Sequence, residues 1–170
     1  MDITRFTSNV TGLARGTLFE VTITGCPVQA VSSEILKFTC NSASIPGSTI
    51  GVIECPYMGR KIKFPGDRTD PEWTATIMLT HDFQIYKDLF NWHSKINDPS
   101  SNISTTDNTN NLKGQALVTM FNQTGKSIFT RKLINFWPSE IQALDVAWEN
   151  TDQLLSLSVT FNYDYSELVD

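Results

Sequence analysis

The sequence predicts a mainly β domain with one flanking helix, and three observations carry that prediction. Apolar and polar residues alternate with period two in several segments, most clearly from Leu155 to Tyr165, which is the pattern of half-buried strands. Only one segment, about residues 82–96, has apolar residues at helical spacing. The chain has 170 residues, enough for one buried core and too few for two. The sequence therefore predicts a single domain, either a two-sheet sandwich or a barrel.

The alternating segments are expected to be strands that supply the core. Besides the C-terminal one, they are residues 19–24, 36–40, 73–79, 116–120 and 128–134. The last two are expected to form a hairpin, because Gly125 between them can supply the positive φ of its loop. The core side chains predicted from these patterns are Phe19, Trp73, Ile77, Trp148, Leu157, Val159 and Phe161.

The helix at residues 82–96 is expected to begin at Asp82, whose carboxylate can cap the first turn. Trp92 lies off the main apolar stripe of this helix, which predicts an exposed side chain at an interface. Residues 97–115 are rich in Asn, Ser and Thr and contain almost nothing apolar. We expect a mobile surface loop there, because such a segment cannot offset its ordering entropy by burial. Residues 1–16 are expected to form an extended N-terminal arm.

Residues 41–66 have a looser pattern. Ile45-Pro46-Gly47-Ser48 is typical of a turn, and residues 50–55 and 57–64 can form the two arms of a long hairpin. The arms lack clean alternation, so they are expected to bury little and to be poorly ordered in a lone subunit.

Composition restricts the function classes. The formal net charge is -5, so the average field repels nucleic acid. No secretory leader and no run of roughly 18 apolar residues is found, which predicts a soluble protein that is not exported. The odd number of cysteines, Cys26, Cys40 and Cys55, is typical of a reducing compartment rather than a disulfide scaffold.

The sequence contains no set of residues at the spacing that a known catalytic motif requires. Gly125-Lys126-Ser127 is similar to the end of a phosphate-binding loop, but Met120 occupies the position of the first required glycine. The remaining candidates are favoured as surface or turn residues, and they are His81, His93, Asp67, Asp70 and Glu72. We therefore expect no enzyme activity, cofactor or metal site.

Two motifs far apart in the chain occur together in one family. The first is Gly66-Asp67-Arg68-Thr69 followed by Trp73-Thr74-Ala75-Thr76, a polar turn that opens into a strand. The second is Trp137-Pro138, then Trp148, an Asn/Asp turn and a final alternating strand that ends at Tyr165. In this order and spacing, the chain from about Thr17 onward resembles the tail tube proteins of contractile-tailed, myovirus-type bacteriophages.

The resemblance implies a β-barrel-like sandwich of two antiparallel sheets, with the helix at its side, and a structural role. Tube subunits of this family form hexameric rings that stack into a hollow conduit for DNA ejection. The implied partners are the chain itself, the tail sheath protein, the baseplate and tail terminator proteins, the tape measure protein, and then DNA in the lumen without tight binding. The implied location is the virion tail, assembled in the host bacterial cytoplasm.

The resemblance also implies that residues 41–66 contact the adjacent ring. The inter-subunit residues expected on this basis are Ile45, Pro46, Ile50, Val52, Tyr57, Met58, Asp67 and Arg68. Two roles stay open for Arg68, a bridge to a neighbour or an ion pair within its own turn. Small polar residues on one face of the last strand are expected to join neighbours edge to edge, namely Ser156, Ser158, Thr160 and Asn162.

Two alternatives from other classes remain. A baseplate tube initiator or a tail terminator would have the same fold but would cap a tube instead of polymerising. A monomeric β-sandwich module would bind a glycan through an exposed tryptophan, Trp92 or Trp137. Self-assembly separates the proposed role from both.

Overall fold

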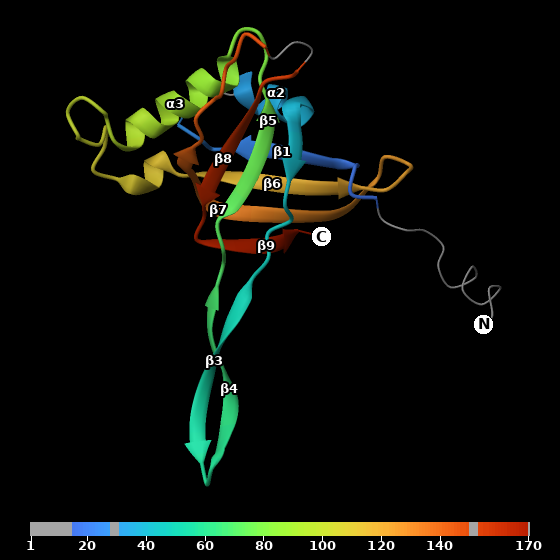
Figure 1. Ribbon diagram of the computed structural model, residues 1–170, viewed down its shortest axis with the longest axis vertical. Coiled ribbons are helices and arrows are strands. Elements are labelled where there is room, and N and C mark those ends of the chain that lie inside the picture. Colours follow the sequence, from blue (N-terminus) through green and yellow to red (C-terminus); the bar gives the residue numbers. More distant parts are fainter. Residues whose placement is uncertain (1–14, 28–30, 150–152, 170) are drawn as a thin grey trace, which may run out of the picture.

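The computed structural model describes residues 15–27, 31–149 and 153–169. The expected N-terminal arm, residues 1–16, lies almost wholly outside the described residues. The chain forms a β sandwich from which one long hairpin projects (Figure 1). The strands are β1 (Phe19–Thr24), β2 (Cys40–Ala43), β3 (Thr49–Tyr57), β4 (Arg60–Thr69), β5 (Trp73–Met78), β6 (Gly114–Phe121), β7 (Ser127–Ile141), β8 (Ser156–Asn162) and β9 (Tyr165–Val169). The helices are α2 (Val31–Thr39), α3 (Gln84–Ile96) and the short 3-10 helix η1 (Thr109–Leu112).

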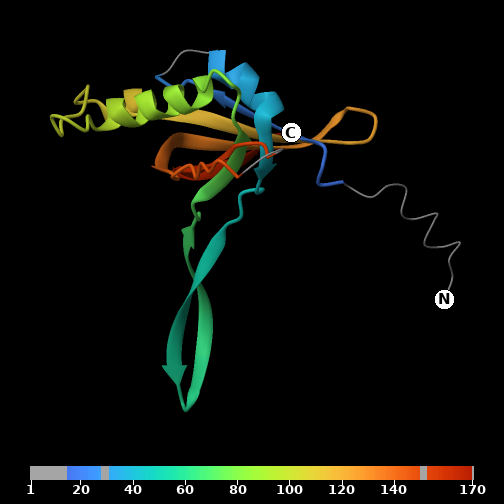
Figure 2. The ribbon, with the colours of Figure 1, turned by 45° about the horizontal axis from the view of Figure 1, so that its top comes forward.

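The predicted class, mainly β with two antiparallel sheets, is confirmed. One sheet contains β1, β6, β7 and β9, and the other contains β7, β8, β5 and β2. The described strands leave β1 and β2 at open ends of this path, so the sheets do not close into a barrel. α2 contacts β1 and α3 contacts β7, and both helices lie on the same side of the sandwich (Figure 2).

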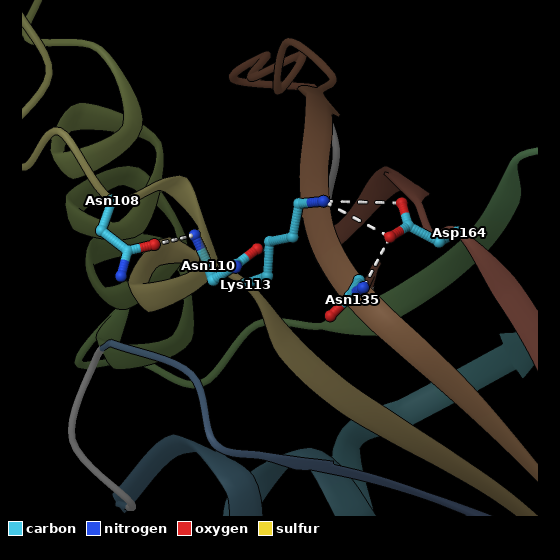
Figure 3. Close-up of polar contacts among 5 residues, drawn as sticks. All are labelled: Asn108, Asn110, Lys113, Asn135 and Asp164. Atoms are coloured by element: carbon cyan, nitrogen blue, oxygen red, sulfur yellow. Dashed lines mark hydrogen bonds and ion pairs between the residues drawn. The ribbon is translucent and has the colours of Figure 1, made fainter.

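β7 belongs to both sheets because it bends at Asn135. The pairing with β6 shifts register there, and Asn135 has a φ of 56°, a left-handed conformation that Asn adopts more readily than most residues. The Asn135 amide donates to the Asp164 carboxylate at 2.5 Å, and Lys113 Nζ lies 3.5 Å from the same carboxylate (Figure 3). The start of β6 and the turn before β9 thus hold the bend.

Aromatic side chains form the centre of the core. The Phe136 and Phe161 rings stack with centroids 4.4 Å apart, and Trp73 lies 5.7 Å and 5.6 Å from them. Trp73 also donates from its indole nitrogen to the Ser44 carbonyl at 2.6 Å. Ile77, Leu157 and Val159 are fully buried around this cluster, and Phe19 packs against it while half-buried.

Two predictions about secondary structure are wrong at one place. Residues 36–40 were expected to be a strand and the domain was expected to have one helix, but α2 occupies residues 31–39. Phe38, which the strand pattern would have buried, is 84% exposed, whereas Leu36 is buried against the core. Leu36 and Cys40 are four residues apart, as are Ile35 and Thr39. A run this short fits both the period of a strand and the spacing of a helix.

Trp92 is also placed differently from the prediction. It is buried, its ring centroid lies 6.4 Å from that of Phe136, and its indole nitrogen donates to the Leu112 carbonyl at 2.7 Å. Ile85, Leu89, Trp92 and Ile96 are spaced by four, three and four residues, so Trp92 belongs to the apolar stripe of α3. The expected exposure of Trp92 is therefore wrong.

Polar contacts are found at the start of α3 and in the loop after it. α3 begins after Phe83, and the carboxylate of Asp82, the expected cap, accepts from the Thr80 hydroxyl and, at 3.5 Å, from the Gln84 backbone N–H. In the loop, Asp98 accepts hydrogen bonds from Ser100 and Ser101, which lower the pKa of its carboxyl to about 2. The mobility expected for residues 97–115 stays a prediction, and η1 interrupts that segment.

Candidate assembly surface

The β3–β4 hairpin is the most exposed element that the structure describes. It extends away from the sandwich in both views (Figures 1 and 2), and every residue of β3 is exposed. Its base is held by the core: β2 precedes it, β5 follows it, and Ala43 pairs with Ala75 across those two strands. The indole of Trp73 reaches Ser44, just before β3. The hairpin is therefore the outward continuation of two core strands.

The register of the hairpin separates its side chains into two faces. Ile53 is opposite Phe64 and Cys55 is opposite Ile62, so these four side chains share one face, which is apolar. The other face is charged near the tip, where Glu54 is opposite Lys63 and bonds to Lys61 at 2.7 Å. The expected lack of alternation in the two arms is wrong from Ile53 to the tip. An apolar face exposed on a thin ribbon indicates a binding surface.

The tip of the hairpin is a two-residue turn, Met58-Gly59. Both residues have positive φ, 46° and 80°, the conformation of a type I′ turn, which favours Asn-Gly or Gly-Gly. Met58 is therefore strained, and it is also 88% exposed. A large apolar side chain retained at a strained, solvated position indicates a role in binding.

Of the residues expected to contact a neighbour, all but Pro46 are exposed. Ile45, Ile50, Val52, Tyr57, Met58 and Asp67 are exposed, as a contact surface requires. Pro46 is buried at the base of the hairpin, so it is not available to a neighbour. Arg68 forms an ion pair within its own chain, with Asp70 at 3.5 Å, which corresponds to the second of its two open roles.

The Gly66-Asp67-Arg68-Thr69 motif is not a turn. It forms the last part of β4, and Asp70-Pro71-Glu72 then connects β4 to β5. Three apolar residues of the exposed face were missed, Ile53, Ile62 and Phe64. The run Lys61-Ile62-Lys63-Phe64 carried the signal for two of them, because it alternates strictly.

A second exposed apolar region lies in the loop between β7 and β8. Trp148 was expected in the core, but it is fully exposed, as are Val146 and Leu154. The chain leaves the sheet after Ile141, and although Leu144 still packs against the core, Trp148 lies beyond it in the loop and contacts none of the core strands that the structure describes. The end of the sequence is strongly acidic, with seven Asp and Glu and no Lys, Arg or His in residues 133–170.

The edges of the sheets differ from those expected. β8 lies between β5 and β7 and pairs with both, so its polar residues cannot join a neighbour edge to edge, and Thr160 is buried. Outside the β3–β4 hairpin, the described strands that pair on one side only are β1, β2 and β9. These edges carry free N–H and C=O groups that another copy can pair.

The described residues contain no group of three or more His, Cys, Asp and Glu side chains arranged to hold a metal ion. Both histidines are exposed, and Asp70 of the carboxylate cluster is occupied by Arg68. No helix in the described part of the chain has the length and apolar character to cross a membrane.

Two cysteines are predicted to differ in reactivity. Burial raises the pKa of the Cys40 thiol to about 11, with a hydrogen bond to the Ser42 backbone as a smaller opposing effect, whereas Cys55 is exposed on the hairpin. At pH 8 roughly one Cys40 in a thousand is a thiolate, the reactive form. We expect maleimide to modify Cys55 first, as mapped by peptide mass spectrometry. Equal rates at both sites would contradict this assignment.

The same pKa shift predicts a pH dependence of stability. The folded pKa of Cys40 is raised above its ordinary value of 9.0, so the folded state favours the neutral thiol. Its stabilising contribution is complete below about pH 9 and is lost as pH rises toward 11. Unfolding curves should therefore show wild type losing more stability than Cys40→Ser over this interval. Parallel losses in the two proteins would contradict the prediction.

Comparisons with known proteins give a consistent result. A sequence model of a family described as "Phage tail tube protein" matches residues 6–167. The tail tube protein gp19 of Enterobacteria phage T4 is 27% identical over 155 residues, which cover 91% of each chain. Among solved structures, a chain of the sheath–tube complex of an extracellular contractile injection system has a TM-score of 0.68 at 15% identity, covering 99% of this chain and 98% of that one. A chain from the sheath/tube terminator of that system has a TM-score of 0.70 at 16% identity, covering 95% and 99%.

Proposed function

Because this chain belongs to the phage tail tube protein family, we propose that its copies close into hexameric rings that stack into the hollow inner tube of a contractile tail. Membership confirms the predicted resemblance, and with it a structural rather than an enzymatic role. In the proposal, residues 1–170 act as one tube domain. The sheath surrounds the tube, the baseplate and terminator bound its ends, and the lumen holds the tape measure protein and later DNA.

The observation that carries the proposal is the amphipathic hairpin. Its apolar face, centred on Ile53, Ile62 and Phe64, is exposed in the single subunit, and its base is fixed to the core through Trp73. A contact to the next ring requires a base that is fixed to the core and an apolar face that is exposed in the single subunit. The hairpin projects along the longest axis of the molecule (Figure 1), so it reaches beyond its own ring.

Ring closure is assigned to the open edges of the sheet that contains β1 and β9. Pairing between copies would remove both edges and their unpaired backbone groups. A closed ring is the symmetric outcome of such head-to-tail pairing when the rotation between subunits closes. Six-fold closure is the number that the family resemblance implies.

The tube role is favoured over the alternatives by a specific observation. The curated relatives that match over 91% of the chain are named tail tube proteins. A terminator has the same fold, so fold similarity does not separate it from a tube subunit. The two tryptophans expected to serve a glycan-binding module are not exposed: Trp92 is buried and donates to the Leu112 carbonyl, and Trp137 is half-buried against the core.

Self-assembly tests the proposal directly. Purified protein at increasing concentration, with and without short preformed tube seeds, is followed by sedimentation velocity and negative-stain microscopy. We expect rings, and stacks of rings that lengthen from the seeds. A monomer at every concentration, with no rings even in seeded samples, would overturn the proposal. Single rings that never stack would favour the terminator role.

The acidic net charge predicts that the tube does not bind DNA tightly. A net charge of -5 per subunit repels a polyanion, and a conduit must not hold its cargo. We expect no duplex binding in a gel-shift assay at about 0.05 M salt, where phosphate contacts would be strongest. Tight binding that weakens with added salt would contradict the conduit role.

A further inference from the structure

The hairpin tip and the β7–β8 loop lie at opposite ends of the molecule. In Figure 1 the tip is at the bottom, and the loop that follows β7 rises to the top beside the turn after β5. The backbone contact between Leu79 and Leu155, at 2.9 Å, fixes that neighbourhood. When identical subunits stack by translation along this axis, the tip of one copy meets the loop end of the next.

The charges of the two ends are opposite. Residues 49–69 hold four basic and two acidic residues, a net charge of +2, whereas residues 142–149 hold two acidic residues, Asp145 and Glu149, and no basic residue. Among the described residues, Arg60 and Lys63 near the tip have no carboxylate partner, and Asp145 and Glu149 in the loop have no basic partner. Complementary charge of this kind orients an association and fixes its register.

The apolar groups of the two ends also match. Met58 projects from the tip at a strained position, and the loop presents Val146, Trp148 and Leu154 to solvent. A pocket lies beneath the loop, lined by Val146 and Leu154 with Ala143 and Asp145 at its side. An apolar anchor entering a pocket with a charged rim is the usual arrangement of a specific protein interface.

We propose that the β7–β8 loop, defined as residues 142–149 with Leu154, is the docking site for the hairpin tip of another copy of this chain. The inference rests on the proposed function, because it assumes that copies stack through the hairpin. It assigns the receiving surface, with Met58 seated against Val146 and Trp148, and Arg60 and Lys63 beside Asp145 and Glu149.

Charge reversal and its rescue test the pairing. Arg60→Glu with Lys63→Glu, or Asp145→Lys with Glu149→Lys, should each slow seeded tube elongation at least about tenfold. Combining all four substitutions in one chain should restore elongation, since every tip then meets a complementary loop. Asp107→Lys is the matched control, because Asp107 is equally exposed but lies in the loop after α3. Normal elongation of both double variants would overturn the proposal.

A crosslink provides a readout that does not depend on elongation rate. In a Cys55→Ser background, Met58→Cys with Val146→Cys should link each subunit to the next, giving a ladder of oligomers on a non-reducing gel of oxidised tubes. Each single variant, and Met58→Cys paired with Asp107→Cys, should give no ladder. Tubes of the Met58→Cys, Val146→Cys variant that give no ladder after oxidation would overturn the docking site and leave the proposed function intact. Failure of the wild-type chain to form any ring or tube would overturn both.

Discussion

Replacing Trp73 with alanine is expected to lower the free energy of unfolding by about 3–5 kcal/mol, the range for large-to-small changes in a core. The side chain is buried, its ring contacts Phe136 and Phe161, and its indole nitrogen satisfies the Ser44 carbonyl. The substitution opens a cavity at the centre of the sandwich and releases the base of the hairpin. Urea unfolding of the monomer, followed by circular dichroism, measures the change.

Trp148→Ala is the matched control, because it removes the same side chain from a fully exposed position. We expect its free energy of unfolding to stay within about 0.5 kcal/mol of wild type, as for most surface substitutions. If Trp73→Ala were equally stable and only failed to assemble, Trp73 would act at an interface rather than in the core. The pair of variants thus separates stability from assembly at two tryptophans.

Shortening the hairpin is expected to abolish tube growth and to leave the subunit folded. Cys55 and Ile62 are paired across the ribbon, two positions from the Tyr57–Arg60 pair that flanks the present turn, so an Asn-Gly turn in place of residues 56–61 can join them without changing register. No core side chain lies in the removed segment. Unfolding measurements should match wild type, while seeded elongation should fall to the background of the microscopy assay. Tubes of normal length would exclude the hairpin as the contact between rings.

A control variant separates the length of the hairpin from its apolar tip. Met58→Asn keeps the length of the hairpin and reduces the strain of the positive φ at this position. It should therefore stabilise the turn while slowing tube elongation. Hydrogen exchange then tests the order of the whole ribbon. We expect its amides to exchange rapidly in the isolated subunit and to be protected in the tube. Equal protection in both states would mean that the hairpin is stable without a neighbour.

The strands could be predicted because alternation reports burial directly when one face of a strand packs on a core. β8 shows this: Leu157, Val159 and Phe161 are all buried at alternate positions. The same rule failed for Trp148, which stands outside any strand. Trp148 was expected to stand at the end of an alternating strand and therefore to be buried, but it lies in the loop between β7 and β8, where its side chain is fully exposed.

The helices show where local pattern is insufficient. Residues 31–39 are short enough to fit either period, and only contact with β1 decides for the helix. The exposure of Trp92 was predicted wrongly because the predicted apolar stripe of α3 passed beside Trp92 and did not include it. The two faces of the hairpin could not be predicted for a different reason. The register depends on the turn at Met58-Gly59, and methionine does not indicate a type I′ turn.

The bend in β7 sets how mechanical load would travel through a tube built in the proposed way. The hairpin is anchored in the sheet of β2, β5 and β8, whereas the edges assigned to ring closure belong to the sheet of β1, β6 and β9. β7 is the strand common to both sheets. Part of the axial tension between rings would therefore pass into the circumference through the corner of β7 at Asn135. The Asn135, Asp164 and Lys113 contacts brace that corner against straightening, so stiffness of the conduit would depend on a few polar contacts remote from either interface.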